Sequence, residues 1–165
     1  MPAGGESLLA GQYTVTWNSV SLGIMEGDQG VPTISQQTAA EMVGNTDAYG
    51  KSNIDGIYQG ANWFAQFTCM EYRAGSIAAF WPYGTLGVMG TIGRLLYSLS
   101  AALVLTAIAG TPAAATPATL TASRAILAPG YNTQLLFGPT LRKVPIRQML
   151  FPYSSGGNIV WFTTT

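Results

Sequence analysis

The sequence has no histidine and a single cysteine, Cys69. Histidine is the most frequent general base and metal ligand in proteins, and one cysteine can build neither an internal disulfide nor a zinc site. The most closely spaced carboxylates, Glu26 and Asp28, lie in a glycine-rich stretch whose spacing does not match a calcium-binding loop. These absences predict a protein that is not an enzyme and holds no metal ion or cofactor.

Motifs for nucleotide and acyl-transfer chemistry are also missing. Glycines recur at every third position in Gly84, Gly87, Gly90 and Gly93, but no Lys-Ser/Thr pair follows them and the spacing differs from that of a dinucleotide site. The sequence also contains no Gly-x-Ser-x-Gly element. We therefore expect these glycines to provide a turn or a close approach of the backbone.

Charged residues are scarce and unevenly distributed. They make up 8% of the chain, against roughly 25% in an ordinary soluble domain. Seven acids and Lys51 give residues 1–71 a net charge of −6, and the six remaining bases give residues 73–165 a net charge of +6. A neutral chain with so few ions is poorly protected against association. We therefore expect neighbouring copies of the chain to cover much of its surface.

The same composition argues against nucleic-acid and membrane partners. Six bases spread over residues 73–165, with no run denser than Leu141-Arg142-Lys143, are too dilute for stable DNA binding. The most apolar stretch, 95–109, is 15 residues long, short of the roughly 20 that a membrane-spanning helix needs. No secretion signal is recognisable at the start. We expect synthesis in a cytoplasm.

Alternation of apolar and polar residues predicts mostly β-strands. In residues 12–17, Tyr13, Val15 and Trp17 share one face, which indicates a half-buried strand. Residues 57–72 carry apolar groups on both faces, which predicts a central strand covered on both sides. Further strands are expected at 95–108, 119–127, 131–137, 144–151 and 158–164.

One short helix completes the expected elements. It is predicted over 74–81, where Pro82 stops it, and Pro145 places the strand at 144–151 at a sheet edge. Six or seven strands with one helix predict a mainly β protein, an antiparallel sandwich or open barrel. We expect a single domain over 12–165, preceded by a flexible N-terminal arm at 1–11.

Residues 26–56 show no periodic pattern and are rich in glycine and small polar residues, which predicts an extended loop. Loops of this length inside a domain usually serve a function. Val43, Tyr49 and Ile54 are too apolar for a solvated segment. We therefore expect this loop to dock on a neighbouring subunit.

Two stretches resemble the tail tube proteins of tailed bacteriophages. One is TDAYGKSNIDGIYQGANWFAQFTCMEY (46–72) followed by AGSIAAFWPYG (74–84), and the other is RAILAPGYNTQLLFGPTLRKVPIRQMLFPY, closing with GNIVWFTTT. The resemblance implies a virion protein with a small β-sandwich or barrel, one flanking helix and a loop that reaches neighbouring subunits. It also implies hexameric rings that stack into a hollow tube, through which DNA passes during ejection without specific binding. The implied partners are further copies, other tail or neck proteins and, in a contractile tail, a sheath.

Stacking of identical rings brings one surface of a subunit against a different surface of the next. We hypothesise that acids within 26–55 meet bases near the C-terminus of an adjacent copy. The candidate interface residues are Glu26, Asp28, Tyr49, Lys51, Asp55, Arg142, Lys143 and Arg147.

Two alternative functions stay open at the level of sequence. A head–tail neck, collar or capsid-associated subunit would form one closed ring or bind a capsid without polymerising. A carbohydrate-binding tail-tip module would use tryptophans as stacking platforms, although tryptophan on an alternating strand face is more often part of a core. The tryptophans are Trp17, Trp63, Trp81 and Trp161.

Overall fold

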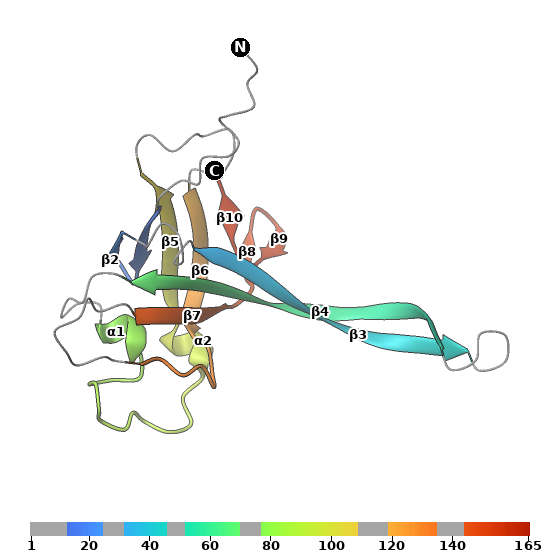
Figure 1. Ribbon diagram of the computed structural model, residues 1–165, viewed down its shortest axis with the longest axis horizontal. Helices are drawn as coiled ribbons and strands as arrows, with labels where there is room; N and C mark the ends of the chain where they lie inside the picture. The colour runs from blue at the N-terminus through green and yellow to red at the C-terminus, as the bar shows by residue number, and fades with distance from the viewer. Residues whose placement is uncertain (1–12, 25–31, 46–51, 70–76, 109–118, 135–143) are drawn as a thin grey trace, which may run out of the picture.

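Antiparallel β-strands make up most of the residues that the structure describes (Figure 1). The computed structural model describes residues 13–24, 32–45, 52–69, 77–108, 119–134 and 144–165. Its elements in chain order are β1 (Tyr13–Trp17), β2 (Val20–Ile24), β3 (Thr33–Asn45), β4 (Ser52–Cys69), α1 (Ile77–Phe80), α2 (Leu96–Leu99), β5 (Ala101–Ala107), β6 (Thr119–Leu127), β7 (Val144–Leu150), β8 (Tyr153–Ser155), β9 (Asn158–Val160) and β10 (Thr163–Thr164). The expected mainly β class is confirmed, with two short helices in place of one.

The main sheet has eight strands in the described part of the chain. Their order is β2-β1-β5-β6-β7-β4-β3, with β10 paired to β6, while β8 and β9 form a separate hairpin. Strand β6 pairs with β5 up to Ala125 and with β7 from Ala125 onward. Figure 1 shows β5 and β6 running across β7 and β4. The open sheet therefore folds on itself at β6, as in orthogonally packed sandwiches.

One hydrophobic cluster joins the strands on both sides of this fold. Alternate residues of β1, β5 and β7 are buried, and Phe67 of β4 and Phe80 of α1 complete the cluster. The alternating residues are Val15, Trp17, Leu103, Leu105, Val144, Ile146 and Leu150. The strands expected at 12–17 and 119–127 are thus confirmed, because each has one face that the core covers.

Trp17 ties β1 to the bend in β6. Its indole N–H donates a buried 3.0 Å hydrogen bond to the carbonyl oxygen of Ala125. Ala125 is the residue at which β6 changes partner from β5 to β7. The bond therefore holds the position at which the sheet turns over the core.

Trp17→Phe should destabilise the protein, because the carbonyl of Ala125 would lose a buried donor. The expected loss is about 1–3 kcal/mol in the free energy of unfolding, measured by chemical denaturation. Trp161→Phe is the comparison, since Trp161 is only half-buried and a phenyl ring would keep its packing beside Trp63. An equal effect of the two substitutions would contradict the role given to the indole N–H.

Strand β7 is not an edge strand, contrary to the expectation from Pro145, because it lies between β6 and β4. The carbonyl of Arg147 accepts a 2.8 Å hydrogen bond from the N–H of Ala128, so backbone groups at 145 and 147 face the side of β6. Strand β6 ends at Leu127, opposite Gln148. The missing N–H of Pro145 therefore points beyond the end of β6 and takes no bond from the ladder.

Residues 26–56 are not one extended loop. Residues 33–45 form β3, and β4 begins at Ser52, before the start expected from the pattern over 57–72. The two strands pair from Thr33 opposite Gln66 to Asn45 opposite Ser52. Apolar and polar residues alternate along a strand that has one buried face. Residues 35–43 of β3 are exposed on both faces, so their sequence has no alternation by which the strand could be identified.

Other expected elements are shorter than their patterns suggested. Helix α1 covers 77–80 of the expected 74–81, of which 74–76 lie outside the described residues, and 158–164 divides into β9 and β10. The start of 95–108 is helix α2, because the hydroxyls of Ser98 and Ser100 each donate a 2.6 Å hydrogen bond to the carbonyl three residues earlier. Of 131–137, residues 131–134 are described and form no strand, and the rest lies outside the described residues.

Strand β4 is central in the sheet, but only one of its faces is buried in the single chain. Ala65, Phe67 and Cys69 point into the core, whereas Gln66 on the other face is exposed and Phe64 is half-buried. The expectation that both faces are covered is therefore wrong for the single chain.

Gln148 is the polar side chain that is most deeply buried in β7. It is 0% exposed, and neither its amide nitrogen nor its amide oxygen has a hydrogen-bond partner among the described residues. An unpaired buried amide is unfavourable, so Gln148→Met should raise the free energy of unfolding by about 1–3 kcal/mol. Gln66→Met, at an exposed position, should change it little. A loss of stability in Gln148→Met would show that the amide is paired in solution.

Candidate functional site

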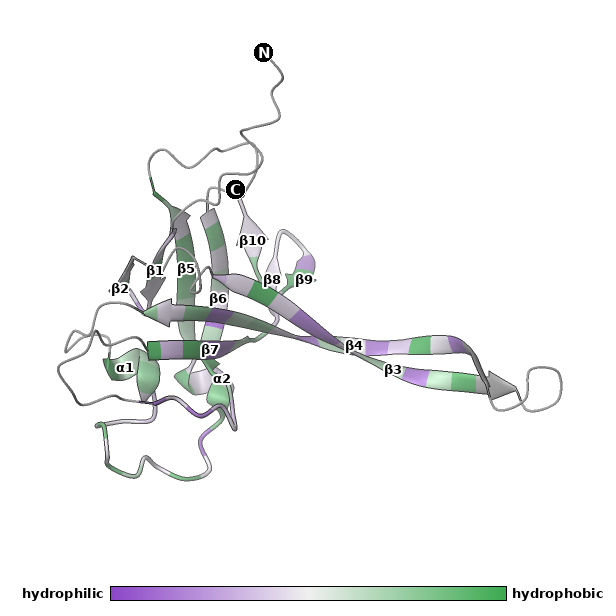
Figure 2. Ribbon diagram, viewed as in Figure 1, coloured by the Kyte–Doolittle hydropathy of each residue, from purple (hydrophilic) through white to green (hydrophobic). Residues whose placement is uncertain are grey.

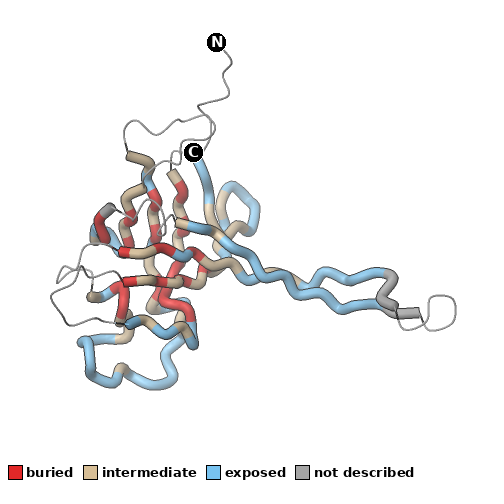
Figure 3. The backbone as a smooth tube through the Cα atoms, viewed as in Figure 1, coloured by how far each residue is buried: buried red, intermediate tan, exposed pale blue. Residues whose placement is uncertain are grey.

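A long hairpin arm projects from the body of the protein (Figures 1 and 3). Strand β4 pairs with β7 only from Trp63 to Cys69, so residues 52–62 pair with β3 alone. We call residues 37–45 and 52–62 the hairpin arm. Its described side chains are exposed, apart from the half-buried Gly60 and Ala61. A two-stranded hairpin without a covering layer is only marginally stable in water.

The register of the hairpin arm gives it two different faces. Ala40 lies opposite Tyr58 and Met42 opposite Gly56, so these four residues share an uncharged face. Glu41 lies opposite Ile57 and Val43 opposite Asp55, so these four share the other face, which we call the acidic face. Figure 2 shows hydrophilic and hydrophobic positions mixed along both strands.

Both faces of the hairpin arm expose large apolar side chains. Between 40% and 63% of the surface of each is open, the extremes being Val43 and Tyr58, with Met42 and Ile57 between them. Monomeric proteins seldom leave contiguous apolar surface uncovered, and large patches usually mark interaction sites. The exposure of these side chains therefore indicates a surface for binding another molecule.

A β-bulge shapes the base of the hairpin arm. The register shifts between Ala39 and Ala40, which leaves Gln59 as the extra residue beside Gly60, whose φ is +130°. The side-chain amide of Gln59 donates a 3.1 Å hydrogen bond to the carboxylate of Glu41. Bulges increase local twist and hinder indiscriminate edge pairing. The arm is therefore a defined structure that favours specific contacts.

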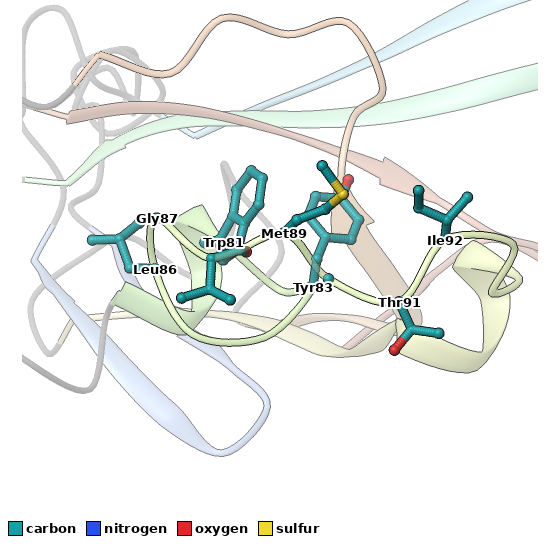
Figure 4. A pocket seen from close by; sticks show the side chains of 9 residues that line it. Trp81, Tyr83, Leu86, Gly87, Met89, Thr91 and Ile92 are labelled. Atoms are coloured by element: carbon teal, nitrogen blue, oxygen red, sulfur yellow. The ribbon is translucent and has the colours of Figure 1, made fainter.

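The glycine-rich segment after α1 forms a second exposed surface (Figure 4). The indole N–H of Trp81 donates a 3.2 Å hydrogen bond to the carbonyl of Val88, and the Trp81 and Tyr83 rings pack edge to face at 5.1 Å. A Cβ on Gly90 would collide with the carbonyl oxygen of Tyr83. The expected close approach of the backbone is confirmed at Gly90, while Gly87, with φ of +78°, fits the expected turn.

This segment presents apolar side chains to solvent around a hollow of about 590 Å³. Between 38% and 83% of the surface of each side chain is open. We call these residues the loop patch: Leu86, Val88, Met89, Ile92 and Leu95. Arg94, between Ile92 and Leu95, is also exposed. The sequence predicted a turn from the glycines here. The large apolar residues between them were not considered, although they indicate an exposed apolar surface.

Two of the eight residues proposed from sequence as interface residues lie in the described structure, namely Asp55 and Arg147. Asp55 is on the exposed hairpin arm, where its carboxylate accepts a 2.7 Å hydrogen bond from the backbone N–H of Gly56. Arg147 lies opposite Gln66, eleven residues further along β4. That separation is roughly 35 Å along the strand, so the two cannot pair within one chain. Glu26, Asp28, Tyr49, Lys51, Arg142 and Lys143 lie outside the described residues.

The side chain of Arg147 packs against the body of the protein, whereas the sequence predicted a charge at a sheet edge. Its guanidinium carbon lies 4.1 Å from the ring centroid of Phe64, a cation–π contact. Its Nε is buried and has no hydrogen-bond partner among the described residues. Gln37 and Tyr131 line the same small cavity of about 240 Å³. Arg147 therefore belongs to the body of the protein, close to the base of the hairpin arm.

The sorting of charge along the sequence is also a sorting in space for the described residues. Both described acids, Glu41 and Asp55, lie on the hairpin arm. The described bases lie on the body: Arg94 in the loop after α1, Arg124 in β6 and Arg147 in β7. The two parts of the molecule can therefore attract each other between copies.

None of the four tryptophans is fully exposed. Trp17 is in the core, and Trp81 donates to the carbonyl of Val88. Trp63 packs against Trp161 and Phe162, at ring-centroid distances of 6.2 and 5.2 Å. Packing thus accounts for Trp17, Trp63 and Trp161, while the half-buried Trp81 also lines the hollow after α1.

The described residues include no group of three or more side chains suited to holding a metal ion. Among the same residues, no helix is long and apolar enough to cross a membrane. Cys69 is a buried free thiol. Burial raises the pKa of Cys69 from 9.0 to about 12, because the ionised form would be desolvated.

Cys69 should therefore react very slowly with thiol reagents in the folded protein. With a pKa near 12, roughly one thiol in ten thousand is ionised at pH 8, and burial blocks access. We expect labelling by a chromogenic disulfide to become rapid only after denaturation. An Ile159→Cys chain, with its new thiol at an exposed position of β9, provides the fast reference. Comparable rates for the two thiols in folded protein would contradict the buried position.

No protein-family model matches this sequence, and no curated protein matches it. Similarity to known proteins therefore assigns neither a family nor a function. Three features therefore bear on function: the hairpin arm, the loop patch and the opposite charges that these two surfaces carry.

Proposed function

We propose that this chain is a structural subunit that assembles with copies of itself into rings, which stack into a hollow tube of the kind found in bacteriophage tails. The observation that carries the proposal is the hairpin arm, whose exposed side chains are covered by none of the elements that the structure describes. The arm has the place and the apolar character expected of the segment that reaches a neighbouring subunit. Its function is assembly, with no chemical step.

The edges of the sheet support the same proposal. Strands β2 and β3 end the main sheet on opposite sides, each with one row of backbone groups that pairs with no other described strand. Open edges are sites at which a strand of another chain can add. Joining edges of neighbouring copies would extend the sheet into a continuous wall, which is how a ring of such subunits encloses a channel.

The low charge of the surface also fits an assembled state. Only five of the residues that the structure describes are acidic or basic. Three of them lie on the arm or in the loop after α1, and each is next to exposed apolar side chains: Glu41, Asp55 and Arg94. An isolated subunit with this surface is prone to association. Burial of these patches between copies would convert that tendency into a specific structure.

Negative-stain electron microscopy of the purified chain, over a series of protein and salt concentrations, tests the proposal. Stacked rings or hollow tubes are expected. Single closed rings that never stack would favour a neck or collar subunit. Monomers at every concentration would contradict self-assembly, and binding on a glycan array would then support the carbohydrate-binding alternative.

Assembly should depend on both faces of the hairpin arm. The double substitution Ile57→Asn and Tyr58→Asn removes one apolar side chain from each face and should raise the protein concentration needed for assembly by about tenfold or more. Circular dichroism should show an unchanged fold, because both residues are exposed. Ile159→Asn is the matched control, since Ile159 is 67% exposed but lies on β9. Tubes that form equally well in all three proteins would refute a role for the arm.

A further inference from the structure

We propose that the acidic face of the hairpin arm in one copy docks on the loop patch of the next copy. The proposal rests on self-assembly as set out above and specifies the pair of surfaces that meet. Both surfaces are exposed in the single chain, and both combine aliphatic side chains with charge. They differ in sign, with Glu41 and Asp55 on the arm and Arg94 at the loop patch.

The two surfaces belong to different copies because of their positions in the fold. Figure 1 shows the arm extending away from the body, while the loop between α1 and α2 lies at the other end of the molecule. Strand β4 is continuous from the arm to its pairing with β7, so the arm cannot turn back without breaking the ladder. The occupant of the loop patch is therefore the arm of another copy.

The chemistry favours this pairing over contact of two arms. Two acidic faces brought together would place the carboxylates of Glu41 and Asp55 against like charges, which is unfavourable. Against the loop patch, Val43 and Ile57 meet aliphatic side chains, and the flanking carboxylates lie near the guanidinium of Arg94. The contact thus combines apolar burial with opposite charge.

The hollow of the loop patch has a suitable size and a fixed shape. Its volume of about 590 Å³ lies within the range of small-molecule pockets, so it can admit individual side chains of the arm. The hydrogen bond from Trp81 to Val88 and the close approach of Gly90 to Tyr83 hold the loop in place without a partner. A preformed acceptor loses little conformational freedom when the arm binds.

The contact has a consequence for the assembly as a whole. An arm that meets a loop patch joins two different surfaces, so after pairing the two copies together still have one free arm and one free loop patch. Such a contact propagates from copy to copy and does not close in a dimer. It can link neighbours around a ring or subunits in successive rings.

Disulfide trapping between two separately substituted chains tests the pairing directly. A chain with Ile57→Cys is mixed with a chain with Met89→Cys under mild oxidation, and the two are distinguished by mass. Cys69 is buried and does not compete. We expect mixed dimers to form at least about tenfold faster than with Tyr58→Cys in place of Ile57→Cys, because Tyr58 lies on the opposite face of the arm. Equal trapping at the two positions, or none in a preparation that forms tubes, would overturn the proposal.

A complementation experiment gives an independent readout. Ile57→Asp and Ile92→Asp should each prevent tube formation alone, since one spoils the arm and the other the loop patch. Mixed together, the two chains retain one intact arm and one intact loop patch, so sedimentation should show a one-to-one pair. If Ile92→Asp forms normal tubes while Ile57→Asp does not, the arm has another acceptor and the pairing is wrong, although self-assembly stands. If the unsubstituted chain does not assemble either, both proposals fail.

Discussion

A two-stranded hairpin that leaves the body of a protein pairs only the inner row of backbone groups on each strand, and it cannot cover its own side chains. This constraint governs the present structure, because β3 pairs with β4 from Thr33 to Asn45 while no other described element lies against the arm. The exposed apolar residues on the arm, Tyr58 among them, stay in water unless another molecule covers them. This exposure is the basis of the proposal that the arm is covered in a larger assembly.

Strand β4 connects that arm to the core. Its inner residues, from Trp63 to Cys69, pair with β7 and bury Phe67 in the hydrophobic cluster, while its outer residues form the arm. A force on the arm acts on the same strand that the core holds. The bend in β6, with the bond from Trp17 to Ala125, keeps the two parts of the sheet over one core. The body is thus a support that fixes the direction of the arm.

The sequence predicted the strands that have one buried face, such as 12–17 and 119–127, because burial imposes alternation. It failed at β3, where residues 35–43 are exposed on both faces and no alternation is required. The prediction from Pro145 was wrong for a related reason. A proline needs only a position at which its own backbone nitrogen has no ladder partner. Such a position exists inside this sheet, because β6 ends before it reaches Pro145. The apolar loop patch was overlooked because glycine spacing describes how a loop turns and says nothing of the surface that it presents.

The charge distribution is where sequence and structure explain each other. Sorting of acids and bases along a chain has no necessary meaning, since a fold can mix the two halves. Here the described acids lie on the arm and the described bases on the body, so the sorting persists in three dimensions. In the assembly that we propose, two like surfaces would repel and two unlike surfaces would attract, which would select head-to-tail contacts over symmetric ones. The few charges of the chain would then decide which of its surfaces meet, while apolar side chains would supply most of the binding energy.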